Sequence, residues 1–156
     1  MIARITAALL VLAGHMPHMQ RPGYIEDLSV AYADAALLTG QPPMLLVSLG
    51  WHESRFLRRA RSSVGATGLM QVLPSAWPSL PLGSLWDDVY AGAYVLSHYQ
   101  RRCGGSAAHW ISGYRAGGRC IPPRDVDLDV VRTWKRIREL PESCAEAVGE
   151  LVEVKR

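Results

Sequence analysis

Apolar residues recur at intervals of three and four between Tyr24 and Leu38. This spacing places them on one side of a helix. Glu26 and Asp27 fall in the first turn of that helix, and Gly40 lies just past its end. The pattern therefore predicts a helix that begins at Tyr24 and ends before Gly40.

Further helices are expected downstream. Pro42 and Pro43 precede residues 44–51, which are so apolar that this helix must be buried on most of its surface. Ser84 and Asp87 resemble a capping box before an apolar run over residues 89–96. A short helix is expected over residues 107–112, one over 130–140 that Pro141 ends, and a last one over 144–152.

No stretch longer than four residues alternates at period two, so at most a small hairpin is expected between residues 61 and 73. We expect a mainly α fold, a single domain of about six helices over residues 22–140, with residues 141–156 as a C-terminal helix or tail. The 156 residues fit one domain, and 49% hydrophobic with 20% charged residues exclude a disordered chain.

The N-terminal 20 residues carry Arg4 and then an uncharged run from Ile5 to Ala13. That length fits a secretory signal and is too short to cross a bilayer. We expect residues 1–20 to be a signal peptide or leader and the protein to be exported, to the periplasm or cell envelope. An uncleaved anchor and an ordinary buried helix stay open. Four residues beyond the run are interpreted as mobile and polar: His15, Met16, His18 and Met19.

Composition adds two observations. Five Trp and six Tyr against one Phe suit a groove that binds sugars, although buried amphipathic core positions explain most such residues. Three cysteines allow one disulfide in an oxidising compartment, for which Cys103 and Cys120 are the candidates, or three reduced thiols. The net charge of +3 is too small to indicate nucleic acid, and no nucleic-acid motif is present.

One carboxylate falls on the most apolar predicted helix. Glu53 shares a helix face with four apolar residues, Leu46, Leu49, Phe56 and Leu57. His52 falls on the other face with Ser48, Arg55 and Arg59. A carboxyl group against apolar walls keeps its proton more readily and can donate it to a leaving oxygen. The alternatives are a salt bridge to Arg55 or Arg58, or an exposed helix end.

The residues around Glu53 favour the catalytic role over these alternatives. The run ESRF, A-x-S-x-x-GATGLMQVLPS over residues 53–75 resembles the signature of the soluble, Slt-type lytic transglycosylases, which are grouped with goose-type lysozymes in the lysozyme-like superfamily. WDDVYAGAYVL over residues 86–96 resembles a later helix of that family, N-I-x-x-G-x-x-Y-L. Tyr114, Arg115, Ala116 and Gly117 stand where the family has Y-N-A-G.

The resemblance implies a lysozyme-like fold and a peptidoglycan lytic transglycosylase, which cleaves between N-acetylmuramic acid and N-acetylglucosamine and leaves a 1,6-anhydro end. Glu53 is the implied catalytic residue, acting as both acid and base. Gln71 is expected to bond sugar groups while Leu69 and Met70 pack, and the Tyr114 hydroxyl is expected near Glu53. The implied substrate-binding residues are Ser62, Gly68, Leu69, Met70, Gln71, Tyr94, Tyr114, Arg115 and Ala116.

Two departures from the family pattern affect the expected substrate contacts. Arg115 replaces the Asn of Y-N-A-G, and Asp88-Val89 replaces the Asn-Ile pair. Arg115 is expected either to meet a peptide-stem carboxylate or to point to solvent. Asp87, Asp88, Asp125, Asp127 and Asp129 lie in segments typical of helix caps or solvated surface.

Other functions stay open at this point. A muramidase would use water in place of the sugar 6-hydroxyl, a slow enzyme would bind without fast turnover, and a non-catalytic wall-binding module would use the arginines near residue 58. Zinc-ligand spacing, phosphate loops and dinucleotide fingerprints are missing from the sequence, so no metal and no cofactor are expected. The expected partner is the peptidoglycan glycan strand, bound by a monomer. Secretion, conjugation or phage machinery and murein recycling stay open as the system it serves.

Overall fold

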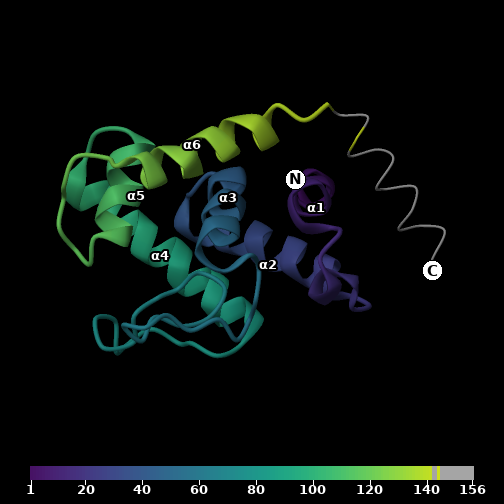
Figure 1. Cartoon of the computed structure of the whole chain (residues 1–156), viewed down its shortest axis with the longest axis horizontal. Coiled ribbons are helices and arrows are strands. Elements are labelled where there is room, and N and C mark those ends of the chain that lie inside the picture. Colours follow the sequence, from purple (N-terminus) through teal and green to yellow (C-terminus); the bar gives the residue numbers. More distant parts are fainter. Residues whose placement is uncertain (142–143, 145–156) are drawn as a thin grey trace.

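The computed structural model describes residues 1–141 and 144, and this part of the chain is mainly helical (Figure 1). In chain order its elements are α1 (Ile2–Ala13), the 3-10 helix η1 (Pro17–Gln20), α2 (Tyr24–Thr39), α3 (Pro43–Ser54), α4 (Leu85–Cys103), α5 (Ala107–Arg115) and α6 (Asp125–Arg138). The prediction of a mainly α domain with about six helices is confirmed. Apart from Cys144, the helix expected over residues 144–152 lies outside the described residues.

Helix ends follow the local signals in the sequence. Helix α2 ends where Gly40 adopts a left-handed φ of 69°, and its amide bonds the Ala36 carbonyl. Helix α4 begins after Ser84, whose hydroxyl oxygen accepts a hydrogen bond of 3.0 Å from the Asp87 amide. Both predicted ends are therefore confirmed, because each depends on residues only a few positions apart.

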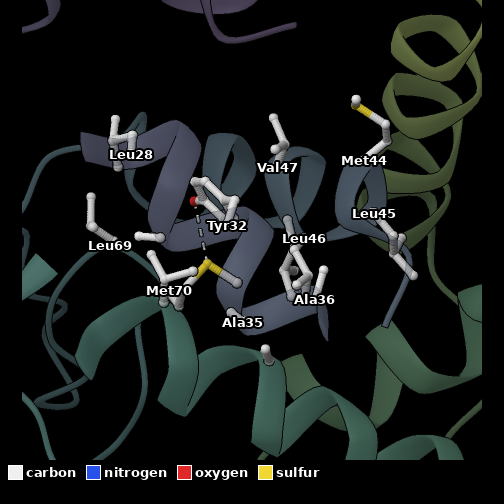
Figure 2. Close-up of a cluster of buried hydrophobic side chains, with 14 of the residues drawn as sticks. Leu28, Tyr32, Ala35, Ala36, Met44, Leu45, Leu46, Val47, Leu69 and Met70 are labelled. Carbon is white, nitrogen blue, oxygen red and sulfur yellow. Dashed lines mark hydrogen bonds between the residues drawn. The ribbon is translucent and has the colours of Figure 1, made fainter. Parts of the chain in front are cut away.

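Helix α3 is the central element of the fold. It contacts α1, α2, α4 and α6, and seven of its first eight residues are buried, as the apolar run predicted. Figure 2 shows the core beside it, where Tyr32 of α2 and Met70 of the loop after α3 meet. The Tyr32 hydroxyl contacts the Met70 sulfur at 3.5 Å. The loop that follows α3 is thereby fixed to the same core as the helix.

The long connection between α3 and α4 contains the expected hairpin in minimal form. Isolated bridges pair Arg61 with Thr67 and Thr67 with Val72. No longer strand forms within residues 1–141. The loop therefore gains most of its rigidity from side chains that reach into the core and from polar contacts to α4.

The N-terminal residues form helix α1, which packs against α2 and α3. Ile5, Ala8 and Leu9 are completely buried. The buried Thr6 and Ser29 hydroxyls lie 2.8 Å apart, within hydrogen-bond distance. In the structure this segment is a buried helix; its role as a signal peptide stays a prediction. Within the described residues no helix combines the length and the apolar character needed to cross a membrane.

The interpretation of His15, Met16, His18 and Met19 as mobile and polar is wrong for three of them, and Met16 is partly buried against the core. Met19 is 1% exposed and packs in the core. The His18 ring nitrogen Nε2 lies 2.9 Å from the Arg55 carbonyl oxygen, and the ring meets Tyr24 edge-on. These contacts hold η1 against the turn that follows α3, so η1 supports the end of the helix that bears Glu53.

A disulfide joins Cys103, the last residue of α4, to Cys120, and Cys144 is not bonded. The sequence left this pairing open. Helix α5 lies inside the closed loop and packs closely on α4 at Gly113, where an added Cβ would lie 2.9 Å from the Cys103 sulfur and 3.0 Å from the Tyr99 ring. The position of α5 is thus fixed both by packing and by a covalent link.

Candidate active site

Glu53 lies in the last turn of α3, and its side chain is 13% exposed. The expectation that this acid points inward is confirmed. His52 points to a different element, because its Nε2 atom lies 2.9 Å from the Thr133 hydroxyl of α6. Burial lowers the pKa of His52, and the Arg55 and Arg115 charges lower it further, so neutral pH favours the uncharged ring.

Helix α3 ends at Ser54, because the next two residues have left-handed backbone angles. Arg55 has a φ of 55° and Phe56 a φ of 60°. The helical pattern that placed Leu57 beside Glu53 and Arg59 beside His52 is therefore wrong beyond Ser54, and Leu57 is 45% exposed. The reversal turns Phe56 into the core, and burying its side chain contributes about 1.5–3 kcal/mol, which offsets the backbone strain.

The pKa of Glu53 is set by burial and by two charged neighbours. Burial raises the pKa of Glu53 above its ordinary value, the Arg115 guanidinium opposes this shift, and the Asp127 carboxylate adds to it. Because burial is the largest effect, Glu53 holds its proton to a higher pH than an exposed glutamate. A carboxyl group in this state is suited to donating a proton near neutral pH.

Arg115 is the ion-pair partner of Glu53, with 3.0 Å between its Nε atom and Glu53 Oε1. The sequence offered Arg55 or Arg58 for this role. The N–H bond is not aimed at Oε1, which has no hydrogen-bond partner within the described chain although it is buried. The contact is therefore an electrostatic one, and the acid oxygen is left ready to accept or share a proton.

The loop over residues 62–71 lies beside the end of α3 and is fixed by backbone contacts. The Ser62 hydroxyl accepts a hydrogen bond of 3.0 Å from the Ala66 amide. The Ser54 hydroxyl of α3 donates to the Leu69 carbonyl at 2.7 Å. The Tyr114 hydroxyl of α5 donates to the Met70 carbonyl at 2.5 Å. The loop is therefore held between the helix that carries the acid and the helix that carries Arg115.

Asp88 holds the same loop from α4, and the expectation that it lies at a cap or on solvated surface is wrong. Its carboxylate is 3% exposed and accepts hydrogen bonds from the Leu69 amide at 3.2 Å and the Gly83 amide at 2.9 Å. A Cβ on Gly68, which has a φ of 77°, would collide with this carboxylate. Asp88 thus bonds the protein's own backbone, in contrast to the expected substrate-side role.

Some of the predicted substrate-binding residues are buried, and others keep a polar atom without a partner. Leu69 and Met70 are fully buried in the core, as the expected packing requires, and in this structure neither has an exposed atom that a ligand could contact. Gln71 donates from its amide nitrogen to the carbonyl oxygens of Ala60 at 3.1 Å and Gly68 at 2.9 Å. Its amide oxygen has no hydrogen-bond partner in the part of the chain that is described, and so this atom is the one left for a ligand.

Gln71 and Tyr114 line a common cavity of about 80 Å³ together with Trp77, Tyr99 and Gly117. Glu53 is not among the residues that line it. Tyr94 is 38% exposed on α4 and meets the Trp77 ring edge-on, with 6.2 Å between the ring centres. The structure thus brings Tyr94, Trp77, Gln71 and Tyr114 to one region, next to the end of α5.

Tyr114 lies close to the acid, as expected. Burial raises the pKa of the Tyr114 hydroxyl well above its ordinary value, and the Glu53 charge raises it further. The hydroxyl stays protonated and donates to the Met70 carbonyl rather than to Glu53. Ala116 caps the C-terminal end of α5, where its amide bonds the Ser112 carbonyl at 2.9 Å.

Asp127 is the second acid near Glu53, and the sequence did not indicate it. It caps the start of α6, one of the two expected positions, but it is completely buried rather than solvated. Its Oδ2 atom accepts from the Arg124 amide and Nε at 2.9 Å each, and its Oδ1 accepts from Nη2 at 3.1 Å. Arg124 three residues earlier was the available signal, because a pair at this spacing at a helix start fixes the carboxylate.

The residues that form this site fall within a known sequence family. Residues 31–123, more than half of the chain, match the family described as the transglycosylase SLT domain. The chain belongs to this family. The stretch matched by the SLT domain includes Glu53, the loop with Gln71, helix α4 and the Tyr114–Arg115 pair.

Among solved structures, the SLT chain is similar to an inactive mutant of the lytic transglycosylase Slt from Pseudomonas aeruginosa. The TM-score is 0.52 and the sequence identity is 25%. The similarity covers 80% of this chain and 24% of the Pseudomonas chain, so the SLT chain spans about a quarter of the length of that relative. Among the described residues, no group of three or more His, Cys, Asp or Glu is arranged to hold a metal ion.

Proposed function

We propose that this SLT domain is a peptidoglycan lytic transglycosylase in which Glu53 is the catalytic acid and base. The observation that carries the proposal is a nearly buried carboxyl group with an unbonded Oε1 atom and a raised pKa. The family match and the similarity to Slt support the choice of substrate. The proposed substrate is the bond between N-acetylmuramic acid and N-acetylglucosamine.

Among the described residues, we infer that a single carboxylate performs the reaction. Asp88 and Asp127 are both buried and both occupied with hydrogen bonds to backbone or to Arg124, so neither is placed to act as a second catalytic acid. Ordinary glycosidases use a pair of carboxylates. Without a second catalytic carboxylate, the substrate's own 2-acetamido group is the available nucleophile next to the anomeric carbon.

The proposed reaction consumes no water, and every proton and bond is accounted for within the substrate and Glu53. Protonated Glu53 gives its proton to the glycosidic oxygen as the bond to C1 breaks, and the acetamido oxygen stabilises the positive charge that develops at C1. The Glu53 carboxylate then takes the proton of the sugar 6-hydroxyl, and the 6-oxygen bonds to C1. The product is a 1,6-anhydro sugar, and Glu53 has its proton again.

The region around Gln71 is proposed to hold the glycan strand. Tyr94 and Trp77 offer aromatic faces, and the Gln71 amide oxygen can accept a hydrogen bond from an acetamido or hydroxyl group. Ser62 and Ala116 lie in the loop and at the helix end, and they are proposed to contact the strand through their backbone. Gly68 is buried, and it is proposed to shape the loop without touching the strand. We also propose that the domain acts outside the cytoplasm, where its substrate lies.

Digestion of purified murein sacculi tests the proposal. The wild-type chain is expected to release muropeptides with anhydro ends, identified by mass spectrometry, while Glu53→Gln releases none and keeps the wild-type circular dichroism spectrum. Glu26→Gln, an exposed glutamate on α2, is the matched control and should remain active. Reducing-end products would show a muramidase, and binding to sacculi without release would show a wall-binding module. Full activity of Glu53→Gln would refute the assigned site.

A further inference from the structure

Arg115 has no role in the proposed mechanism and stands where the family pattern has Asn. It is the last residue of α5, and its side chain is 23% exposed. Its Nε atom lies 3.0 Å from Glu53 Oε1, and its Nη1 atom donates to the Val126 carbonyl at 2.9 Å. The guanidinium group is therefore held between the acid and the start of α6.

The other groups around Glu53 leave Arg115 as its counter-ion. From α6, Asp127 brings a negative charge, which Arg124 holds with a bidentate ion pair. From α5, Tyr114 brings a neutral hydroxyl that is bonded to the Met70 carbonyl. From α3 itself, the neighbouring His52 is bonded to Thr133 and disfavours its own positive charge. Arg115 is thus the cation that faces Glu53 among the described residues.

This contact conflicts with the first step of the reaction. A general acid must carry a proton when the glycosidic oxygen reaches it, at a distance of about 3 Å. A guanidinium at 3.0 Å from Oε1 stabilises the carboxylate without its proton and fills the space that a sugar oxygen would need. The arrangement seen in the free protein is therefore a resting state of the site.

We propose that Arg115 is a positioning residue that pairs with Glu53 in the resting site, opposes its protonation, and must leave Oε1 before the acid can donate to the glycan. The inference rests on the proposed role of Glu53. Because the Arg115 N–H is not aimed at Oε1 while its other end is well bonded to Val126, the side chain can leave the acid and keep its tether. Bound substrate would then favour the protonated, competent form of Glu53.

The pH profile of the full chain tests this role. The variant Arg115→Asn carries the family's residue, and Arg115→Lys keeps the charge. Removing the cation should raise the pKa of Glu53, so the high-pH limb of kcat/KM on soluble glycan strands should move up by about one pH unit in Arg115→Asn. Above that limb, the protonated fraction and the rate should rise by up to about tenfold. Arg115→Lys should keep the wild-type limb.

A titration without substrate separates this proposal from the proposed function. The carboxyl carbon of Glu53, labelled with carbon-13 and assigned by its loss in Glu53→Gln, should titrate at higher pH in Arg115→Asn than in the wild-type chain. An unchanged titration in folded Arg115→Asn protein would overturn the role of Arg115, even if Glu53 proves essential. A lower kcat/KM with an unmoved limb would overturn it as well, and would assign Arg115 to substrate binding. A shifted titration in a chain that cleaves no glycan would uphold the ion pair and reject the enzymatic function.

Discussion

At the scale of single residues, Glu53 combines burial with an ionisable group, and this has a consequence for stability. Burial raises the pKa of Glu53 in the folded state above the ordinary value of 4.5. A raised pKa of an acid means that the folded state binds the proton more tightly than the unfolded state. The stabilising effect is present below pH 4.5 and is lost as the pH rises through the folded-state pKa.

Comparison of the wild-type chain with Glu53→Gln checks whether stability falls as the pH rises. Glutamine does not ionise, so the free energy of unfolding of the wild-type chain should fall relative to that of Glu53→Gln as the pH rises from 4 to 8. Urea unfolding at several pH values measures the difference. A difference that does not change with pH would show that Glu53 has the same pKa in both states, and Glu26→Gln supplies the reference for an exposed acid.

Replacing Asp88 should lower the free energy of unfolding, because its carboxylate accepts two backbone hydrogen bonds. In Asp88→Ala the Leu69 and Gly83 amides lose their acceptor, and each unsatisfied amide costs about 1–3 kcal/mol. Urea unfolding should show the loss, and cleavage of sacculi should fall because the loop with Gln71 is released from α4. Asp34→Ala, an exposed acid on α2, should change the unfolding free energy by less than about 0.5 kcal/mol.

At the scale of elements, sequence reasoning succeeded where the signal was local. The start of α4 follows from Ser84 and its hydrogen bond to the Asp87 amide, and the end of α2 follows from Gly40. The end of α3 was misjudged, because nothing within one turn of Ser54 breaks a helix. The left-handed angles at Arg55 and Phe56 arise from the distant core that Phe56 enters.

The α4 cap gives an element-level prediction. Ser84→Ala removes the acceptor for the Asp87 amide and should lower the free energy of unfolding by about 1 kcal/mol. Chemical denaturation measures it, with Ser79→Ala in the exposed part of the preceding loop as the control. Equal effects of the two changes would show that the cap does not stabilise α4.

The site shows the same division between local and distant signals. The inward direction of Glu53 follows from the apolar residues of its own helix. The ion pair with Arg115 joins residues that are far apart in the chain, and the choice among several arginines depends on how α5 packs against α3 and α6. The buried state of Asp88 and Asp127 was missed for the same reason, since a helix start is equally compatible with solvent.

At the scale of the whole molecule, the disulfide joins the end of α4 to the segment after α5. Cys103 and Cys120 are 17 positions apart. Closing a loop of this size lowers the entropy of the unfolded chain and stabilises the folded state by about 3 kcal/mol. The double change Cys103→Ser with Cys120→Ser should lower the free energy of unfolding by about that amount. Cys144→Ser, which removes the unbonded cysteine, should leave it unchanged.

The same link bears on the alignment of the candidate active site. Tyr114 and Arg115 both lie on the helix that the bond encloses, so the precision with which they face Glu53 depends on whether the two thiols have been oxidised. In a reducing cytoplasm α5 would be held by packing alone, and the acid and its counter-ion would be less well aligned. The proposed activity would therefore depend on the redox state of the Cys103–Cys120 pair.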